Sequence, residues 1–383
     1  MTGERESGPP TPGSVPDEIP IADPEVSDAA VDRVVDVLRS GQLADGPAVR
    51  SFETAFAASC DADHAVATSN GTTALHAALE AVGVGPGSTV VTTPFSFVAT
   101  ANAVRLSGAT PAFADVDPGT YDLDPHSVEE RIRDLGGDVD AILAVHLYGL
   151  PADLDHLADV ADTYDVPLVE DAAQAHGATF DGEPVGAVGD VGTFSFYPTK
   201  NMTTGEGGMV TTDRSDVAAA AARFVNHGRA SSGYEHVELG HNFRLTSMAA
   251  AIGSVQLERL GQFVEARRDN ARILTAALED TPAVTPTVPD GREHAYHQYT
   301  IRCGNRDEVR DALASHGIDS AVYYPTPIHE QPAYDGVGVD VEAPVAERLA
   351  DEVLSLPVHP NVSREAAAYV GRVLAEDVEV AGV

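Results

Sequence analysis

GTFSFYPTKNMTTGEGGMV, residues 192–210, is the stretch of this chain that says most about its fold. It leaves an apolar strand-like run at Ser195, passes through a loop that carries Lys200, and continues past Gly205, Gly207 and Gly208. Glycines let a backbone approach a ligand closely. The stretch therefore predicts a strand end, a functional loop and a second strand.

Lys200 is the only lysine in a chain that has 23 lysines and arginines together. Arginine replaces lysine on most surfaces, but its guanidinium stays protonated and cannot act as an amine nucleophile. A bond to a carbonyl cofactor requires a primary amine whose pKa can be lowered. Lys200 could be retained for its amine chemistry, or it could be present by chance. The residues around it in the sequence distinguish these two interpretations.

The segments before and after Lys200 alternate between strand and helix patterns. Helical spacing occurs at 27–41, 49–60 and 151–164. Short β-branched runs, apolar on both faces, occur at 88–93, 109–116, 140–149, 166–172, 191–196 and 208–212. The sequence therefore predicts an α/β fold with a mostly parallel, helix-covered sheet, whose ligands lie beyond the carboxyl ends of the strands.

The chain is expected to contain three parts. Residues 1–20, rich in Pro, Gly, Ser and Glu, are typical of a disordered tail. Residues 21–262 hold the sheet and form the large domain. A long helical region at about 246–279, a strand-like run at 296–303 and helices at 306–317, 343–355 and 363–376 place a small α+β domain at 263–383.

Two further motifs fit a phosphate-bearing cofactor with a pyridine ring. TSNGTTALHAALEAVG, residues 68–83, joins a strand-like run to a helix and presents Gly71 and Thr72 at the helix start, where phosphate binds well. Simple helix capping is the alternative. VPLVEDAAQAHG, residues 166–177, places Asp171 at a strand end and Gln174 three residues on. A carboxylate there can keep a pyridine nitrogen protonated, although Asp171 could also cap a helix.

The composition excludes some classes of protein. With 60 acidic and 23 basic residues the formal charge is −37, which repels nucleic acid and anionic membranes. Acids spread through every segment suggest a salt-loving host, because salt screens their repulsion; ordinary surface acidity is the alternative. No apolar core of a signal peptide opens the chain, so we expect a cytoplasmic protein. Cys60 and Cys303 are not spaced as metal ligands, and no metal is expected.

Taken together, these motifs resemble the DegT/DnrJ/EryC1/StrS family of sugar aminotransferases, which have the type I fold of pyridoxal-phosphate enzymes. The resemblance runs from about residue 20 to 376. It includes SNGTTALHAAL, FSFVATANAV, VEDAAQAHGA, SFYPTKNMTTGEGGMV and GHNFRLTSMAAAIGSVQLERL.

That resemblance implies pyridoxal 5'-phosphate as the cofactor. It implies that Lys200 holds the coenzyme covalently, that Asp171 pairs with the pyridine nitrogen and that Gln174 lies near the phenolic oxygen. It further implies that Gly71, Thr72 and Ser195 bind the phosphate and that Phe97 stacks on the ring. Asn242 would reach the phosphate from the partner subunit of a homodimer.

The expected reaction moves an amino group from an amino acid, by family analogy glutamate, to a keto sugar linked to a nucleotide. Tyr324, His329 and Arg229 are candidates for contacting substrate, but YYPTPIH (323–329) and Asn242-Phe243-Arg244 depart from the family pattern. A sugar dehydratase is one alternative, although such relatives carry histidine in place of the lysine. A noncatalytic, coenzyme-binding regulator and an acidic solute-binding protein are the others.

Overall fold

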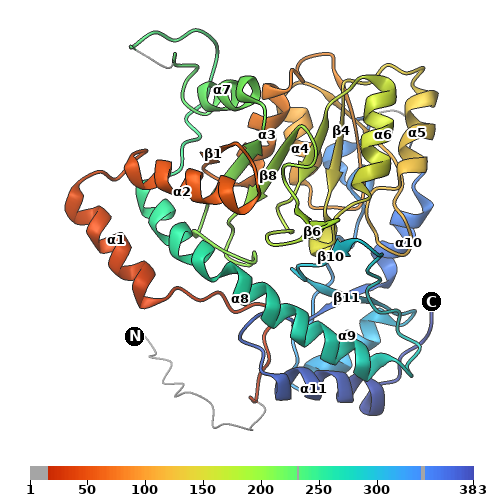
Figure 1. Ribbon diagram of the computed structural model, residues 1–383. Helices are drawn as coiled ribbons and strands as arrows, with labels where there is room; N and C mark the ends of the chain where they lie inside the picture. The colour runs from red at the N-terminus through yellow and green to blue at the C-terminus, as the bar shows by residue number, and fades with distance from the viewer. Residues whose placement is uncertain (1–15, 231–232, 338–340) are drawn as a thin grey trace.

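The computed structural model describes residues 16–230, 233–337 and 341–383 and shows a large α/β body joined to a smaller lobe (Figure 1). The body is built on one seven-stranded sheet with the order β1-β9-β8-β5-β4-β2-β3. Its strands are β1 (His64–Thr68), β2 (Thr89–Thr92), β3 (Thr110–Phe113), β4 (Ala141–Val145), β5 (Leu168–Asp171), β8 (Val191–Ser195) and β9 (Gly208–Thr212). This confirms the predicted α/β class.

The sheet is parallel from β3 to β8, and β9 runs antiparallel to both β8 and β1. The register aligns Val145 of β4 with Asp171 of β5 and Asp171 with Thr193 of β8. The carboxyl ends of these neighbouring strands therefore meet at one edge, where Ser195 ends β8 and the loop to β9 carries Lys200.

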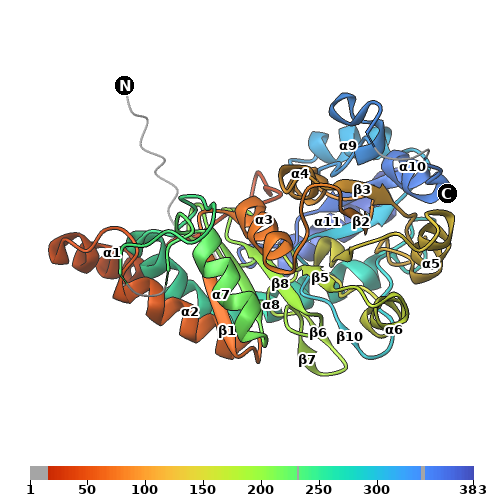
Figure 2. The same cartoon turned by 90° about the horizontal axis from the view of Figure 1, so that it is seen from above.

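Helices cover both faces of this sheet, as Figure 2 shows from above. The helices of the body are α1 (Asp28–Ser40), α2 (Pro47–Ser59), α3 (Gly71–Ala81), α4 (Ala99–Leu106), α5 (Pro125–Asp134), α6 (Leu154–Tyr164), α7 (Ser215–Phe224) and the first half of α8 (Ser247–Leu278). Apolar side chains of α3, α4 and α7 form one hydrophobic cluster with the sheet, and those of α2, α5, α6 and α8 form another. Two buried layers therefore fix the sheet between helices.

The small lobe is assembled on the second half of α8. Its other elements are the antiparallel strands β11 (Tyr299–Arg302) and β12 (Val353–Leu356) and the helices α9 (Arg306–Ser315) and α11 (Arg364–Arg372). Leu274 and Leu278 of α8 belong to its hydrophobic cluster, whereas Ala249 and Ala250 belong to the body. The boundary between the large and small domains at 262/263 stays a proposal, because α8 continues across it without a break.

Short elements complete the chain and correct two local predictions. A small sheet consists of β6 (Thr179–Phe180), β7 (Glu183–Pro184) and β10 (Arg292–Glu293). The strand predicted at 140–149 ends at Val145 and is followed by a short 3-10 turn, Leu147–Gly149, in which Tyr148 adopts a positive φ of 56°. The helix predicted at 343–355 is α10 (Pro344–Glu352), and the chain continues directly into β12. None of the described helices is long and apolar enough to cross a membrane.

The predicted tail is too long at its carboxyl end. Residues 1–15 lie outside the described residues, but Ile19 is buried in the small lobe and forms a β-bridge with Ile318. Its N–H donates to the Gly317 carbonyl at 2.8 Å. One apolar residue in a polar segment was too weak a signal to predict this attachment.

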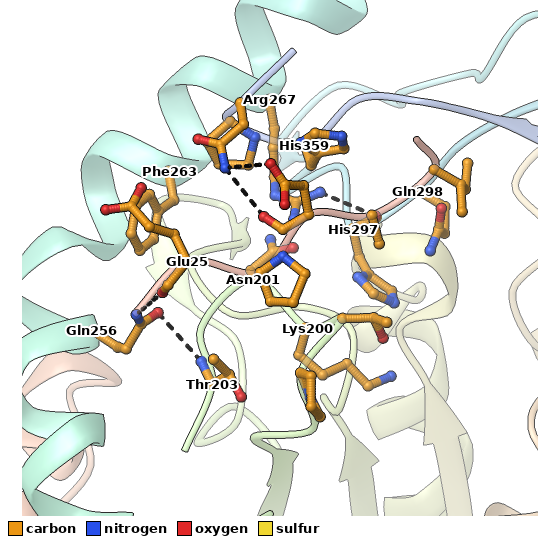
Figure 3. A pocket seen from close by; sticks show the side chains of 18 residues that line it. Glu25, Lys200, Asn201, Thr203, Gln256, Phe263, Arg267, His297, Gln298 and His359 are labelled. Atoms are coloured by element: carbon orange, nitrogen blue, oxygen red, sulfur yellow. Dashed lines mark hydrogen bonds between the residues drawn. The ribbon is translucent and has the colours of Figure 1, made fainter. Parts of the chain in front are cut away.

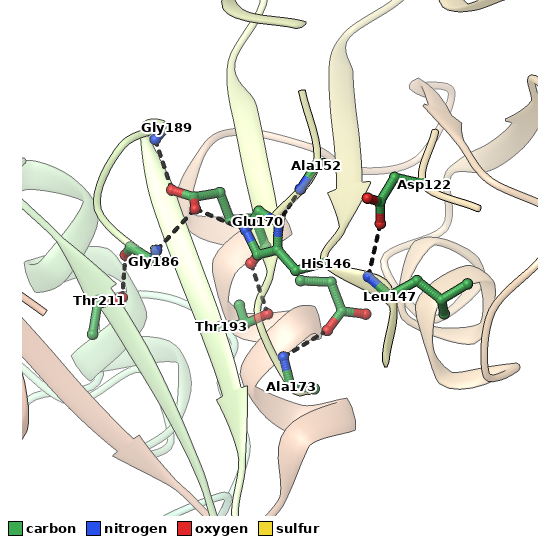
Figure 4. Close-up of polar contacts among 11 residues, drawn as sticks. Asp122, His146, Leu147, Ala152, Glu170, Ala173, Gly186, Gly189, Thr193 and Thr211 are labelled. Carbon is green, nitrogen blue, oxygen red and sulfur yellow. Dashed lines mark hydrogen bonds and ion pairs between the residues drawn. The ribbon is translucent and has the colours of Figure 1, made fainter. Parts of the chain in front are cut away.

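Glu170 and His146 form a buried polar network under the strand ends (Figure 4). His146 accepts the Ala152 N–H at Nδ1, so its Nε2 carries the proton that is donated to Glu170 Oε2 at 2.9 Å. The N–H groups of Gly186 and Gly189 also donate to this carboxylate, at 2.8 and 2.7 Å. Burial raises the pKa of Glu170, but these donors outweigh it and hold the pKa below its ordinary value.

We expect Glu170→Gln to lower the free energy of unfolding by about 3–5 kcal/mol at neutral pH, because it breaks a fully buried polar network. A carboxyl with a lowered folded pKa contributes stability above its unfolded pKa, and that contribution is lost as the pH falls. The free energy of unfolding, measured by urea titration, should therefore differ less between wild type and variant below about pH 4.5. A difference that stays constant with pH would contradict this account.

Candidate active site

Asp171 and Glu170 are adjacent on β5, so their side chains point to opposite faces of the sheet. Asp171 lies on the α4 side, where the Thr100 hydroxyl donates to Oδ2 at 2.9 Å and the Ala173 N–H donates to Oδ1 at 3.2 Å. Burial raises the pKa of Asp171, opposed by these donors and by the Lys200 cation. The carboxyl is thus fixed by two hydrogen bonds, and it forms no ion pair with any cation among the described residues.

Lys200 follows Ser195 on the loop between β8 and β9, and its side chain is partly buried. Burial lowers the pKa of its amine to about 8, and the Asp171 carboxylate opposes this shift. About half of the amine is therefore unprotonated near pH 8, which is the state that attacks a carbonyl. The sole lysine amine is thus close enough to Asp171, which lies in a different sequence motif, for their two charges to interact.

Gln174 is held in one orientation by two hydrogen bonds. Its Oε1 accepts the Tyr148 N–H at 2.8 Å, and its Nε2 donates to the Tyr324 hydroxyl at 2.9 Å. The ring of Tyr324 stacks on that of Tyr148, with centroids 6.1 Å apart. Tyr324 is thus brought to the site from a distant segment, while one Gln174 N–H remains for another acceptor.

Gly71, Thr72 and Ser195 lie together at the start of α3. Asn70 caps this helix and accepts the Thr73 N–H at 2.9 Å. The N–H groups of Gly71 and Thr72 have no acceptor among the described residues. A Cβ placed on Gly71 would lie 2.7 Å from the Ser195 Cβ, so only glycine allows the helix start to approach the end of β8 this closely.

Phe97 follows β2 and leaves 59% of its surface exposed, which is unusual for a phenylalanine beside a buried site. A free helix start for an anion, a buried carboxyl for a ring nitrogen, an oriented amide and an amine of lowered pKa are the features a pyridoxal phosphate molecule requires. The residues present therefore fit that coenzyme.

Comparison with known proteins agrees with this geometry. Residues 24–375 match the model of the DegT/DnrJ/EryC1/StrS aminotransferase family. The chain belongs to this family. Sugar aminotransferases with pyridoxal phosphate are among the proteins it resembles, and this chain is accordingly a pyridoxal-phosphate-dependent sugar aminotransferase.

Three similar proteins illustrate the range of the family. The pleiotropic regulatory protein of Geobacillus stearothermophilus is 42% identical, over 90% of this chain and 93% of its own length. The UDP-N-acetyl-3-dehydro-alpha-D-glucosamine 3-aminotransferase of Acidithiobacillus ferrooxidans is 39% identical, over 85% and 87%. The PLP form of the sugar aminotransferase Spr1654 of Streptococcus pneumoniae has a TM-score of 0.87 at 27% identity, over 94% and 98%.

Three predicted residues contact other parts of the chain. Asn242 is exposed and forms a β-bridge with Asn226. Arg229 donates to the Gly233 carbonyl and lies over the ring of Tyr234. His329 pairs with Glu347 at 3.2 Å. Their roles toward substrate or a partner's coenzyme stay predictions.

His329, Glu330 and Glu347 place ligand atoms within 4.8 Å of one another, the one such grouping in the described ranges. Both glutamates are exposed, and the His329–Glu347 pair accounts for the grouping without a cation.

Sequence reasoning missed several residues of the site. Thr100, whose hydroxyl fixes Asp171, lies in the quoted FSFVATANAV motif but carries no local signal of that role. Arg267 lies in a helical pattern and His297 in a strand-like run, and both patterns look structural. Only the fold shows that they line the same pocket as Lys200.

Proposed function

We propose that this enzyme moves an amino group from glutamate to a keto sugar linked to a nucleotide. The observation that carries the proposal is the sole lysine amine beside Asp171 at the strand ends. When bound, pyridoxal phosphate supplies an electron-withdrawing ring and an aldehyde that accepts the amine. Within this site Lys200 would hold the coenzyme and then move the proton from the donor's Cα, while Asp171 would keep the proton on the ring nitrogen.

The other assigned residues would orient the coenzyme. Gly71 and Thr72 would donate backbone N–H groups to its phosphate, with the Ser195 hydroxyl beside them. Gln174 would donate its remaining N–H to the phenolic oxygen, and Phe97 would cover the ring. Arg229 and Arg244 could hold a sugar phosphate or a donor carboxylate, and Tyr324 and His329 could contact the sugar.

Two alternatives remain to be separated from this function by experiment. A sugar dehydratase of this family would carry histidine in place of Lys200. A noncatalytic regulator is suggested by the name of the relative from Geobacillus stearothermophilus. The buried amine of lowered pKa favours a transaminase, because a regulator that only binds the coenzyme has no need of a proton acceptor there.

The test is a screen of nucleotide-linked 3-keto and 4-keto sugars with glutamate, read by product mass. We expect release of 2-oxoglutarate and an amino sugar with at least one sugar. Loss of a hydroxyl in place of gain of an amine would indicate the dehydratase. Absence of 2-oxoglutarate with every sugar would contradict the proposal.

Salt dependence is expected from the charge of −37. Self-repulsion of a compact acidic surface weakens as salt shortens the Debye length from about 10 Å at 0.1 M to about 3 Å at 1 M. We expect the midpoint of thermal unfolding and the turnover rate to rise between dilute buffer and molar potassium chloride. Full stability and activity in dilute buffer would remove the inference of a salt-loving host.

A homodimer with Asn242 acting on the partner's coenzyme completes the proposal. Asn242 is exposed in the single chain, and the segment 233–243 also exposes Tyr234 (83%) and Leu239 (88%). Large exposed apolar side chains are typical of protein interfaces. These features support a partner that covers this segment.

Mixing Lys200→Arg and Asn242→Ala chains after dissociation tests the exchange. If Asn242 acts in trans, each hybrid dimer has one intact site, and random pairing should recover about a quarter of wild-type activity. If Asn242 acts within its own chain, neither site of the hybrid is intact. No recovery above the two parent variants would therefore contradict the proposal.

A further inference from the structure

A pocket beside Lys200 contains buried polar atoms that lack partners. The residues that line it include Lys200, Asn201, Arg267, His297 and His359, and we call it the Arg267 pocket. Figure 3 shows Arg267 and His359 at one end and Lys200 at the other, with Asn201 and His297 between them. The space between the lining atoms, including the part open to solvent, is ≈ 540 Å³.

Arg267 is a buried cation without an acidic partner. Its Nη1 donates to the carbonyls of Tyr296 and His297, at 3.1 and 3.2 Å, which leaves its Nε–H buried without an acceptor. Asp23 and Glu25 also line the pocket, but among the described residues Glu25 pairs with Arg259 and Asp23 accepts from Asn361, and neither forms an ion pair with Arg267. Burial lowers its pKa to about 10, which leaves it charged at neutral pH. An uncompensated buried cation in a chain of net charge −37 calls for an anion.

The rest of the pocket offers hydrogen-bond acceptors. Asn201 donates its Nδ2 to the Ala295 carbonyl at 3.0 Å, which fixes the amide and leaves Oδ1 without a donor. His359 shares its Nε2 proton with the Pro20 carbonyl at 3.0 Å, so its Nδ1 is unprotonated in the neutral ring and also lacks a partner. All three side chains are at least nine-tenths buried. The Arg267 end of the pocket therefore offers a cationic donor, and Asn201 Oδ1 offers an acceptor between Arg267 and Lys200. This arrangement complements a molecule that has an anionic group at one end and an N–H group nearer Lys200.

We propose that the Arg267 pocket is the subsite for the amino donor, with a carboxylate of the donor on the Nε edge of Arg267 and its amine directed past Asn201 toward Lys200. This inference rests on the proposed transamination and names a residue for its donor half. An arginine whose Nε and Nη edge is free binds a carboxylate through two parallel hydrogen bonds. The keto sugar, which brings no donor carboxylate to that edge, would not depend on Arg267.

Arg268 provides a matched control on the same helix. It donates from Nε to the His294 carbonyl at 2.9 Å, so it supports the same loop as Arg267. It differs because Glu293 pairs with it at 3.0 Å and because it does not line the pocket. A purely structural role should therefore appear in both variants, and a carboxylate-binding role only in one.

The binding test is calorimetric titration of the holoenzyme with glutarate, which has carboxylates but no amine, at one fixed salt concentration. We expect Arg267→Gln to weaken glutarate binding by about 10- to 100-fold, as for loss of a charge-assisted pair. Arg267→Lys should be intermediate, because it keeps the charge and a donor but loses the planar edge. Arg268→Gln should change binding by less than about threefold. Equal loss in both Gln variants, or no loss in Arg267→Gln, would overturn the proposal.

The kinetic test separates the two halves of the reaction. In the Arg267 variants the KM for glutamate should rise by a similar factor, whereas reaction of the aminated enzyme with keto sugar should be unchanged. If Arg267→Lys slows the glutamate half-reaction and the keto-sugar half-reaction equally, Arg267 has a structural role and the proposal fails. If wild type releases no 2-oxoglutarate with any sugar, the proposed function fails, whatever the glutarate titrations show.

Discussion

Lys200→Arg is expected to remove covalent coenzyme attachment and to lower turnover by about 10⁴-fold or more, because it removes both the nucleophile and the proton carrier. The substitution keeps the positive charge, but a guanidinium stays protonated and forms no such bond. The measurement is the visible absorbance of the purified protein together with 2-oxoglutarate release.

The chain offers a strong control because it has no second lysine. Arg39 is an exposed helix residue, with 78% of its side chain accessible. The double variant Lys200→Arg/Arg39→Lys again has one lysine, but that lysine lies outside the site on an exposed helix. Its activity should therefore stay absent. Turnover by Lys200→Arg at more than a few per cent of wild type would contradict the assigned role.

Asp171→Asn is expected to slow the donor half-reaction by roughly 10²- to 10⁴-fold. Removing the charged partner of a buried protonated nitrogen costs about 3–5 kcal/mol, which corresponds to that range in rate. The measurement is a single turnover of the holoenzyme with glutamate, followed by coenzyme absorbance. Asp165→Asn is the control, since Asp165 is exposed on the turn before β5 and has a positive φ of 54° that asparagine tolerates.

Asp171→Asn should affect the free energy of unfolding in the opposite direction from Glu170→Gln. Burial raises the pKa of Asp171, so the folded protein disfavours its charged form, and its protonated form contributes stability at low pH that is lost as the pH rises. The amide that replaces this carboxyl is neutral at every pH, so the apoprotein of the Asp171→Asn variant should unfold at neutral pH with an unchanged or larger free energy. A large loss of stability would show that Asp171 is primarily structural.

The sequence predicted the sheet and the positions of Asp171 and Lys200 at its edge, because these depend on local patterns. β-branched runs separated by helical spacing specify parallel strands, and a residue at the end of such a strand must lie at the ligand edge. Asp171 and Lys200 follow from this rule and from the rarity of lysine. The register of β5 against β8 then brings their segments together.

The remaining features depend on contacts between distant segments. Tyr324 reaches Gln174 across 150 residues, and the pocket of Arg267 joins α8 to residues 21–25 and 359–361. An arginine on a helix with other arginines has no sequence signal that distinguishes a buried, unpaired guanidinium from a surface one. Positive φ values at Tyr148 and Tyr324, at 56° and 61°, are likewise imposed by packing.

Reduction of the holoenzyme with borohydride, followed by peptide mass spectrometry, tests the central claim most directly. The account predicts that the peptide containing Lys200 gains the mass of the reduced coenzyme. A reduced holoenzyme whose coenzyme is released on denaturation, with Lys200 unmodified, would contradict it.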